Sequence, residues 1–181
     1  KNKKIILYQG ALNKGRGLEL MIESMTFLDD ACFLIIIGSG DIEKLLHKMV
    51  FELNLEEKVT FIEKISPNEL QKLTPLADLG ISFEENLGLN YNYALPNKLF
   101  DYIQAKIPVL VSNLDEMSNL VLTYNVGEIL LNRNPKDVAI QIAQILQKEK
   151  LFYRDQLEFA SNELIWENES KKLIEIYNNI E

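Results

Sequence analysis

Short apolar runs alternate with longer amphipathic segments along nearly the whole chain, and this alternation restricts the fold more than any other feature. The apolar runs are residues 5–8, 33–37, 59–62, 79–83, 108–111 and 128–131. The segments between them carry apolar residues at helical spacing, and Ser66-Pro67-Asn68-Glu69 has the capping-box pattern of a helix start. This order predicts an α/β fold, a Rossmann-like parallel sheet sandwiched by helices.

The expected helices follow the same pattern. They cover residues 18–25, 42–53, a segment from 67, 96–104, 115–122 and 135–148, with two more beyond, the last starting near Trp166. The chain has 181 residues, without a repeat or an evident linker. We therefore expect a single domain over residues 1–181.

Charge and cysteine content exclude several classes of protein. The formal net charge is −8, so the surface as a whole does not attract a nucleic-acid backbone, and an anionic ligand must be held by a few local basic groups. Cys32 is the only cysteine, which excludes a disulfide framework and indicates a small buried residue. Its apolar run is far shorter than the about 18 residues of a membrane span. The expected location is the cytoplasm.

Gly10 to Gly17 links the first strand to the first helix. Its three glycines permit close backbone approach, and Lys14 and Arg16 add positive charge at a helix start. The segment suits a diphosphate, although it matches neither a Walker loop nor G-x-G-x-x-G. A flexible glycine turn with exposed basic side chains is the alternative.

Two further segments follow strands. Gly38-Ser39-Gly40 follows the second strand, where a plain strand-to-helix turn is the favoured interpretation; as an NAD fingerprint it is misplaced. Pro96 opens a helix whose first turn holds Asn97 and Lys98, suited to phosphate, with Asp101 one turn further. A carboxylate there can accept two hydrogen bonds from a ribose diol, or it can form a solvated charge pair with Lys98.

The ordered succession of several short strings resembles the C-terminal half of the family-4 (group 1) retaining glycosyltransferases of the GT-B fold. The strings are Leu7-Tyr8-Gln9-Gly10, Arg16-Gly17-Leu18-Glu19, Ile36-Ile37-Gly38-Ser39-Gly40, Val59-Thr60-Phe61, Ala77-Asp78-Leu79-Gly80-Ile81-Ser82, Pro96-Asn97-Lys98-Leu99-Phe100-Asp101-Tyr102 and Pro108-Val109-Leu110-Val111-Ser112. The resemblance covers nearly the whole chain.

The resemblance implies a site for a nucleotide-diphosphate-sugar donor, with no cofactor and no metal, because basic groups and helix N-termini neutralise the diphosphate. Arg16, with Lys14 beside it, matches the phosphate-binding and catalytic cation, and Gly10 lies by the diphosphate. Asp101 matches the second acid of the E-x7-E motif, which holds the ribose. Gly38 and the segment containing Glu63 match the wall around the base.

This sequence departs from the family pattern at three positions. Ala11 stands where many members have a second phosphate-binding Arg, so Lys14 or Lys98 must replace that charge. Asp101 is one methylene shorter than the usual Glu. Counting back from Asp101 puts the first Glu of E-x7-E on Tyr93. Glu84 or Glu85 contacts the sugar only if the loop is longer here.

The resemblance also implies partners for this chain and leaves alternative functions open. An N-terminal domain, absent from this chain, holds the acceptor, and peripheral membrane association arises only through that domain. Bacterial polysaccharide or glycolipid assembly is the expected setting, at the inner face of the membrane in the full-length protein. A nucleotide-sugar epimerase and a non-catalytic binding module are the rival functions, with NAD-dependent oxidoreduction behind them. His47, mid-helix beside Lys48, is expected on the surface.

Overall fold

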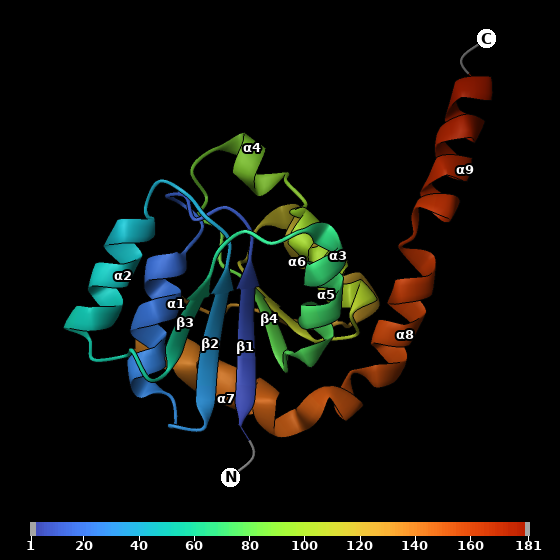
Figure 1. Cartoon of the computed structure of the whole chain (residues 1–181). Coiled ribbons are helices and arrows are strands. Elements are labelled where there is room, and N and C mark those ends of the chain that lie inside the picture. The colour runs from blue at the N-terminus through green and yellow to red at the C-terminus, as the bar shows by residue number, and fades with distance from the viewer. Residues whose placement is uncertain (1–2, 180–181) are drawn as a thin grey trace.

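The computed structural model describes residues 3–179, and in this part of the chain six parallel strands form one sheet (Figure 1). The strands are β1 (Lys4–Gln9), β2 (Cys32–Ile37), β3 (Val59–Ile62), β4 (Leu79–Ser82), β5 (Val109–Val111) and β6 (Gly127–Ile129). Their order is β3-β2-β1-β4-β5-β6, and every neighbouring pair is parallel. The expected Rossmann-like α/β fold is confirmed.

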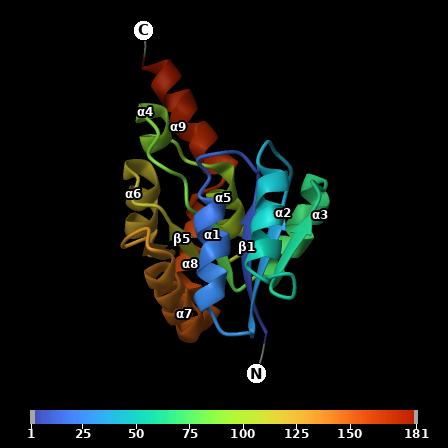
Figure 2. The ribbon, with the colours of Figure 1, turned by 90° about the vertical axis from the view of Figure 1, so that its left-hand side faces the viewer.

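Helices cover both faces of this sheet (Figures 1 and 2). They are α1 (Leu18–Ser24), α2 (Glu43–Glu52), α3 (Pro67–Leu73), α4 (Leu89–Asn92), α5 (Asn97–Gln104), α6 (Asp115–Tyr124), α7 (Pro135–Phe152), α8 (Arg154–Glu163) and α9 (Trp166–Asn178), with the 3-10 turns η1 (Met25–Phe27) and η2 (Thr74–Leu76). Helix α1 packs against α2 and α7, whereas α8 packs against α5 and α6. The connections therefore wind in both directions from β1, as in doubly wound sheets.

Local sequence signals account for most element boundaries. At α3 the Ser66 hydroxyl accepts from the Glu69 N–H at 3.3 Å, and the Glu69 carboxylate accepts from the Ser66 N–H at 3.0 Å, so the predicted capping box is present. Several boundaries differ from the prediction by one to four residues; helix α7, for example, ends at Phe152 and not at residue 148. Strand β6 begins at Gly127, where a Cβ would lie 2.0 Å from the Val109 carbonyl oxygen, so only glycine permits this close strand pairing. The polar and aromatic composition of residues 84–95 predicts an irregular stretch, but it contains the short helix α4.

The core lies on both faces of the sheet and fixes α5 in place. Every residue of β4 and β5 is buried, as expected for a parallel sheet covered on both sides. Tyr102 on α5 is fully buried against Gly80, where a Cβ would lie 2.5 Å from the tyrosine ring. Its hydroxyl donates to the Leu7 carbonyl at 3.2 Å and accepts from the Gln9 N–H at 3.2 Å. These contacts fix α5 against β1 and β4.

From β1 the chain runs outward on one side to β2 and β3, and then crosses back to β4 on the other side of β1. This change of direction places a crevice between β1 and β4. Ligands of open α/β sheets bind at this point, outside the carboxyl ends of the strands. Helix α4 lies beyond the same edge (Figure 1). Helix α9 projects away from the sheet and buries no side chain. Within residues 3–179 no helix is long and apolar enough to cross a membrane.

Candidate donor site at the sheet edge

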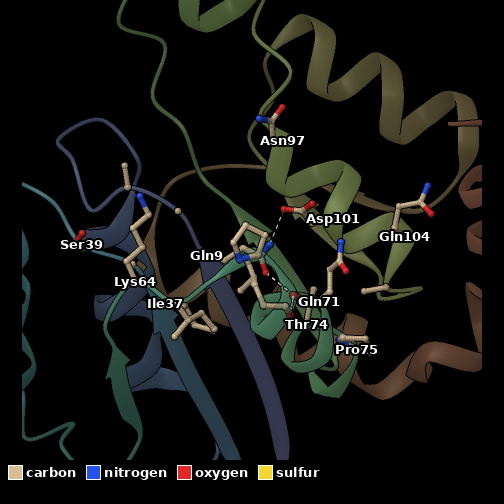
Figure 3. Close-up of a pocket in the computed structure, with 17 residues that line it drawn as sticks. Gln9, Ile37, Ser39, Lys64, Gln71, Thr74, Pro75, Asn97, Asp101 and Gln104 are labelled. Carbon is tan, nitrogen blue, oxygen red and sulfur yellow. Dashed lines mark hydrogen bonds between the residues drawn. The ribbon is translucent and has the colours of Figure 1, made fainter. Parts of the chain in front are cut away.

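Two adjoining cavities open at the crevice between β1 and β4. The larger has a volume of about 830 Å³ and the smaller about 350 Å³. Both are lined by Gln9, Gly10, Ala11, Asn97 and Asp101, together with Leu70. The larger one continues past the end of β3 and along α3 (Figure 3). The combined space is in the size range of sites for small molecules and cofactors.

Glycines let two loops meet at the wall of the larger cavity. Gly10 (φ 140°) and Gly38 (φ 148°) follow β1 and β2, and the Gly10 N–H donates to the Ile37 carbonyl at 2.9 Å. A Cβ at Gly38 would lie 1.9 Å from the Gly10 carbonyl oxygen, so a side chain there would force the loops apart. The predicted site residues Gly10 and Gly38 therefore lie together at this wall.

Arg16 reaches the smaller cavity because Gly17 turns the chain tightly beside β4. Gly17 has φ 68°, and a Cβ there would lie 2.1 Å from the Phe83 carbonyl oxygen. The Arg16 Nη1 atom lies 3.7 Å from Glu84 Oε1. Lys14, in the same loop, is exposed and lines neither cavity. The structure thus brings only one of the two predicted loop cations into the site.

Glu84 and Lys98 form a buried ion pair at the back of the smaller cavity. Lys98 Nζ lies 2.8 Å from Glu84 Oε1, and their side chains are 8% and 3% exposed. The Ser82 hydroxyl donates to Glu84 Oε2 at 2.6 Å. Burial raises the pKa of Glu84, but the Lys98 charge and the hydrogen bonds from Lys98 and Ser82 outweigh it, so that the pKa lies below its ordinary value. Burial lowers the pKa of Lys98, against the attraction of Glu84.

The aromatic ring of Tyr8 contacts the Lys98 ammonium. The Nζ atom lies 4.1 Å from the centroid of the Tyr8 ring, a cation–π contact, and the Tyr8 hydroxyl donates to the Ala11 carbonyl at 2.7 Å. Burial raises the pKa of this phenol well above its ordinary value. Lys98 Nζ also lies 3.8 Å from the position that a Cβ on Gly10 would take. A cation therefore stands beside the loop in which Ala11 provides none.

Asp101 and Asn97 lie on the face of α5 that borders both cavities. The Gln9 side-chain N–H donates to Asp101 Oδ2 at 2.8 Å (Figure 3). Burial raises the pKa of Asp101, and this hydrogen bond partly offsets the increase. Asn97 is exposed at the first turn of α5, whose N-cap residue, Pro96, makes no side-chain cap hydrogen bond. The first-turn N–H groups of α5 thus adjoin the cavities.

The other predicted acids take different positions. Glu63 is exposed and lines neither cavity, whereas the next residues, Lys64 and Ile65, line the larger one. Glu85 lines neither cavity, and its Oε1 lies 3.9 Å from an Arg133 nitrogen. The segment near Glu63 therefore contributes to the cavity wall through its neighbours.

Sequence reasoning missed Arg133, which holds the segment containing Glu84. From the loop between β6 and α7, its guanidinium donates to the carbonyl oxygens of Phe83 at 3.0 Å and Glu84 at 3.4 Å, and to the Ser112 hydroxyl at 3.1 Å. It resembles any surface arginine in a polar loop, so no sequence pattern marks it. Gln9 was also missed, although a polar residue ending an apolar strand was a visible signal.

Two residues outside the site are placed as expected. Cys32 is buried, and His47 is exposed on α2, with its ring 4.0 Å from that of Phe61. Within residues 3–179 no three His, Cys, Asp or Glu side chains are grouped so that they could hold a metal ion.

The sheet order, the glycine loops and the cavities at the crevice define a doubly wound α/β protein with a candidate ligand site at the carboxyl ends of its strands. The family follows from the sequence match. This chain belongs to the glycosyl transferases group 1 family, whose model matches residues 1–162.

Curated relatives are distant and longer. An uncharacterized glycosyltransferase of Methanocaldococcus jannaschii is 23% identical over 183 residues, which cover 97% of this chain and 45% of the relative. The spore coat protein SA of Bacillus subtilis is 24% identical over 191 residues, covering 97% of this chain and 48% of that protein. The chain thus spans about half the length of the curated relatives it matches.

Solved structures share the fold. The HepE protein of Anabaena, solved in complex with UDP, has a TM-score of 0.85 at 14% identity, covering 99% of this chain and 50% of that one. The C-terminal domain of a group 1 family glycosyl transferase from Francisella tularensis has a TM-score of 0.68 at 16% identity, covering 88% of this chain and 85% of that one. At these identities the likeness concerns the fold.

Proposed function

We propose that this chain binds a nucleotide-diphosphate sugar in the two adjoining cavities and forms the donor half of a retaining glycosyltransferase. The observation that carries this proposal is how the charged and polar side chains are distributed between the two cavities. Arg16 and Lys98 line only the smaller cavity, Asp101 lines both cavities, and Lys64 and Ile65 line only the larger one. This order matches a diphosphate, a ribose and a base.

Arg16 and Lys98 neutralise the diphosphate that leaves when the sugar is transferred. Lys98 lies beside Gly10, Arg16 lines the same smaller cavity, and the N–H groups at the start of α5 add to the positive field. Lys98 replaces the charge that Ala11 lacks. Because these groups supply the neutralisation, we propose that no metal is needed. The Anabaena relative solved with UDP supports a nucleoside-diphosphate ligand.

Asp101 accepts the ribose hydroxyls, and the base lies against the segment that follows β3. Glu84 does not contact the sugar in this proposal, since Lys98 and Ser82 occupy its carboxylate. The acceptor is held by a second, N-terminal domain, in keeping with relatives about twice as long as this chain. The reaction takes place in the cytoplasm, with any contact to a membrane made through that second domain.

Isothermal titration with UDP, GDP, ADP and NAD in metal-free buffer tests this proposal. One nucleoside diphosphate is expected to bind saturably, and Arg16→Ala should weaken it by about tenfold or more, the value of a charge-assisted contact. Lys44→Ala, which removes an exposed cation on α2, is the matched control and should change nothing. Binding of NAD alone, or equal affinity of Arg16→Ala and the unaltered chain, would contradict the proposal.

A further inference from the structure

Gln9 is a buried amide whose two ends face different elements of the site. Its side chain lies between Asp101 on α5 and Thr74 in η2 (Figure 3). The Nε2 atom donates to Asp101 Oδ2 at 2.8 Å, and Oε1 accepts from the Thr74 hydroxyl at 2.9 Å. Both Gln9 and Thr74 are 2% exposed. Three groups from distant parts of the chain thus form one hydrogen-bonded relay that ends at the cavity.

We propose that Gln9 and Thr74 are positioning residues that aim the Asp101 carboxylate at the ribose of the donor and thereby set the preference for ribonucleotides over dideoxynucleotides. This inference rests on the proposed function, in which Asp101 accepts the ribose hydroxyls. Neither Gln9 nor Thr74 needs to contact the hydroxyls to have this effect.

The chemistry of the relay allows one orientation of the Gln9 amide. An ionised carboxylate only accepts hydrogen bonds, so the amide nitrogen must face Asp101. The amide oxygen then faces Thr74, which has a hydroxyl to donate. Exchanging the two ends of the amide would place two oxygens 2.8 Å apart, one of them charged. The Thr74 hydroxyl thus gives the buried amide oxygen the partner that it requires.

The Gln9 end of the relay is anchored through its backbone, because the Gln9 N–H donates to the Tyr102 hydroxyl at 3.2 Å. At the other end the Thr74 hydroxyl has one proton, which the Gln9 amide oxygen at 2.9 Å and the Leu70 carbonyl at 2.8 Å share. Tyr102 is on the same helix as Asp101. Helix α5, strand β1 and turn η2 are therefore held in register around the amide, as a preorganised binding group requires.

Asp101 needs such support because it is short and borders open space. It is exposed and lines both cavities. With Oδ2 occupied by Gln9, the Oδ1 atom and the remaining lone pairs stay available to a diol. Without the relay, the carboxylate would turn among its rotamers and would bind the hydroxyls less well.

The test compares UDP, GDP and ADP with their 2′,3′-dideoxy analogues, by titration of the unaltered chain, Gln9→Met, Thr74→Val and Thr74→Ser. For the diphosphate that binds, Gln9→Met and Thr74→Val should each lower the affinity for the ribonucleotide by about five- to tenfold, the value of one polar contact. Affinity for the dideoxy analogue should stay unchanged within about twofold, because that ligand has no hydroxyl for Asp101 to accept. Thr74→Ser keeps the hydroxyl and should retain the preference.

The outcomes separate this inference from the proposed function. Equal weakening of both ligands by Thr74→Val, or loss of the preference in Thr74→Ser, would overturn the relay while leaving donor binding intact. If the unaltered chain binds no nucleoside diphosphate, the proposed function and the relay both fail. The two affinities are measured on the same folded protein, so reduced stability cannot imitate a change in their ratio.

Discussion

Two carboxylates of this domain have similar partners but lie in different surroundings. Glu84, at the crevice, accepts from Lys98 at 2.8 Å and from Ser82 at 2.6 Å, and its side chain is 3% exposed. Glu128, on the edge strand β6, accepts from Lys148 at 2.7 Å, Tyr153 at 3.1 Å and Gln141 at 3.2 Å, and its side chain is 24% exposed. In both cases burial raises the pKa, but the bound lysine and the hydrogen bonds lower it by more, so that it lies below its ordinary value.

The difference lies in what surrounds each carboxylate. The partners of Glu128 come from α7 and the residue after it, so this network fastens the edge strand to its covering helix. Glu84 sits where the loops after β1 and β4 meet α5, and Arg16 is 3.7 Å away. The Glu128 network holds β6 against α7, whereas the Glu84 network holds two cations, Lys98 and Arg16, beside a cavity. Similar hydrogen bonding therefore serves structure at the edge strand and, in our proposal, ligand binding at the crevice between β1 and β4.

The largest expected effect is the loss of stability in Glu84→Gln. This change leaves the buried Lys98 ammonium without its counter-charge and should lower the free energy of unfolding by about 3–5 kcal/mol at neutral pH. Chemical denaturation measures it. Glu85→Gln, which alters a partly exposed pair, is the control and should cost about 1 kcal/mol or less.

The pH dependence sharpens this prediction. Because the pKa of Glu84 lies below its ordinary value, its stabilising effect is present above the ordinary pKa and is lost as the pH falls through the lowered one. The gap in stability between the unaltered chain and Glu84→Gln should therefore shrink at acidic pH, below about 4. A gap that stays constant into acid would contradict the ion-pair account.

A smaller effect is expected from Arg133→Gln, which frees the carbonyl oxygens of Phe83 and Glu84. Loss of these hydrogen bonds should cost about 1–2 kcal/mol of stability and should weaken nucleotide binding, because Glu84 no longer presents Lys98 and Arg16 in fixed positions. Arg133→Lys should not restore binding, since an ammonium lacks the planar fork. Titration measures binding, with Lys136→Gln as the control for an exposed cation in the next turn. Unchanged nucleotide affinity in Arg133→Gln would show that this arginine does not contribute to nucleotide binding.

The smallest effect is expected at the other carboxylate. Glu128→Gln alters a part-exposed network and should cost about 1 kcal/mol or less, with no change in nucleotide affinity. Denaturation and titration of this variant beside Glu84→Gln test the comparison directly. A loss of stability equal to that of Glu84→Gln would show that the two networks do not differ as described.

Periodicity predicted the fold well because both the sheet and its helices follow local rules. The apolar runs gave the strands, and the capping box gave the start of α3. The glycines after β1 also predicted a place where backbones approach closely, and a Cβ at Gly38 would lie 1.9 Å from the Gly10 carbonyl oxygen. Lys98 and Asp101, three residues apart on one helix, were expected on one face, and both line the smaller cavity.

The positions that could not be predicted depend on contacts between distant residues. Counting back from Asp101 gave Tyr93, which is 60% exposed, because the segment from residue 84 to 95 has no periodic pattern to indicate which acid turns inward. Glu84 turns inward because Lys98, 14 residues away, neutralises it there. Arg133 acts across 49 and 50 residues of sequence, so its role follows only from the folded sheet edge.

The most direct test of the central claim is a two-dimensional amide NMR titration of the isotope-labelled chain with UDP, GDP and ADP. The account predicts saturable shifts for one of these ligands at Gly10 to Arg16, at Gly38 and Ser39, and at Asn97 and Lys98. The amides around Glu128 and Gln141 should stay unchanged. Saturable shifts confined to α7 and β6, or no saturable shift with any of the three ligands, would contradict a donor site at the crevice between β1 and β4.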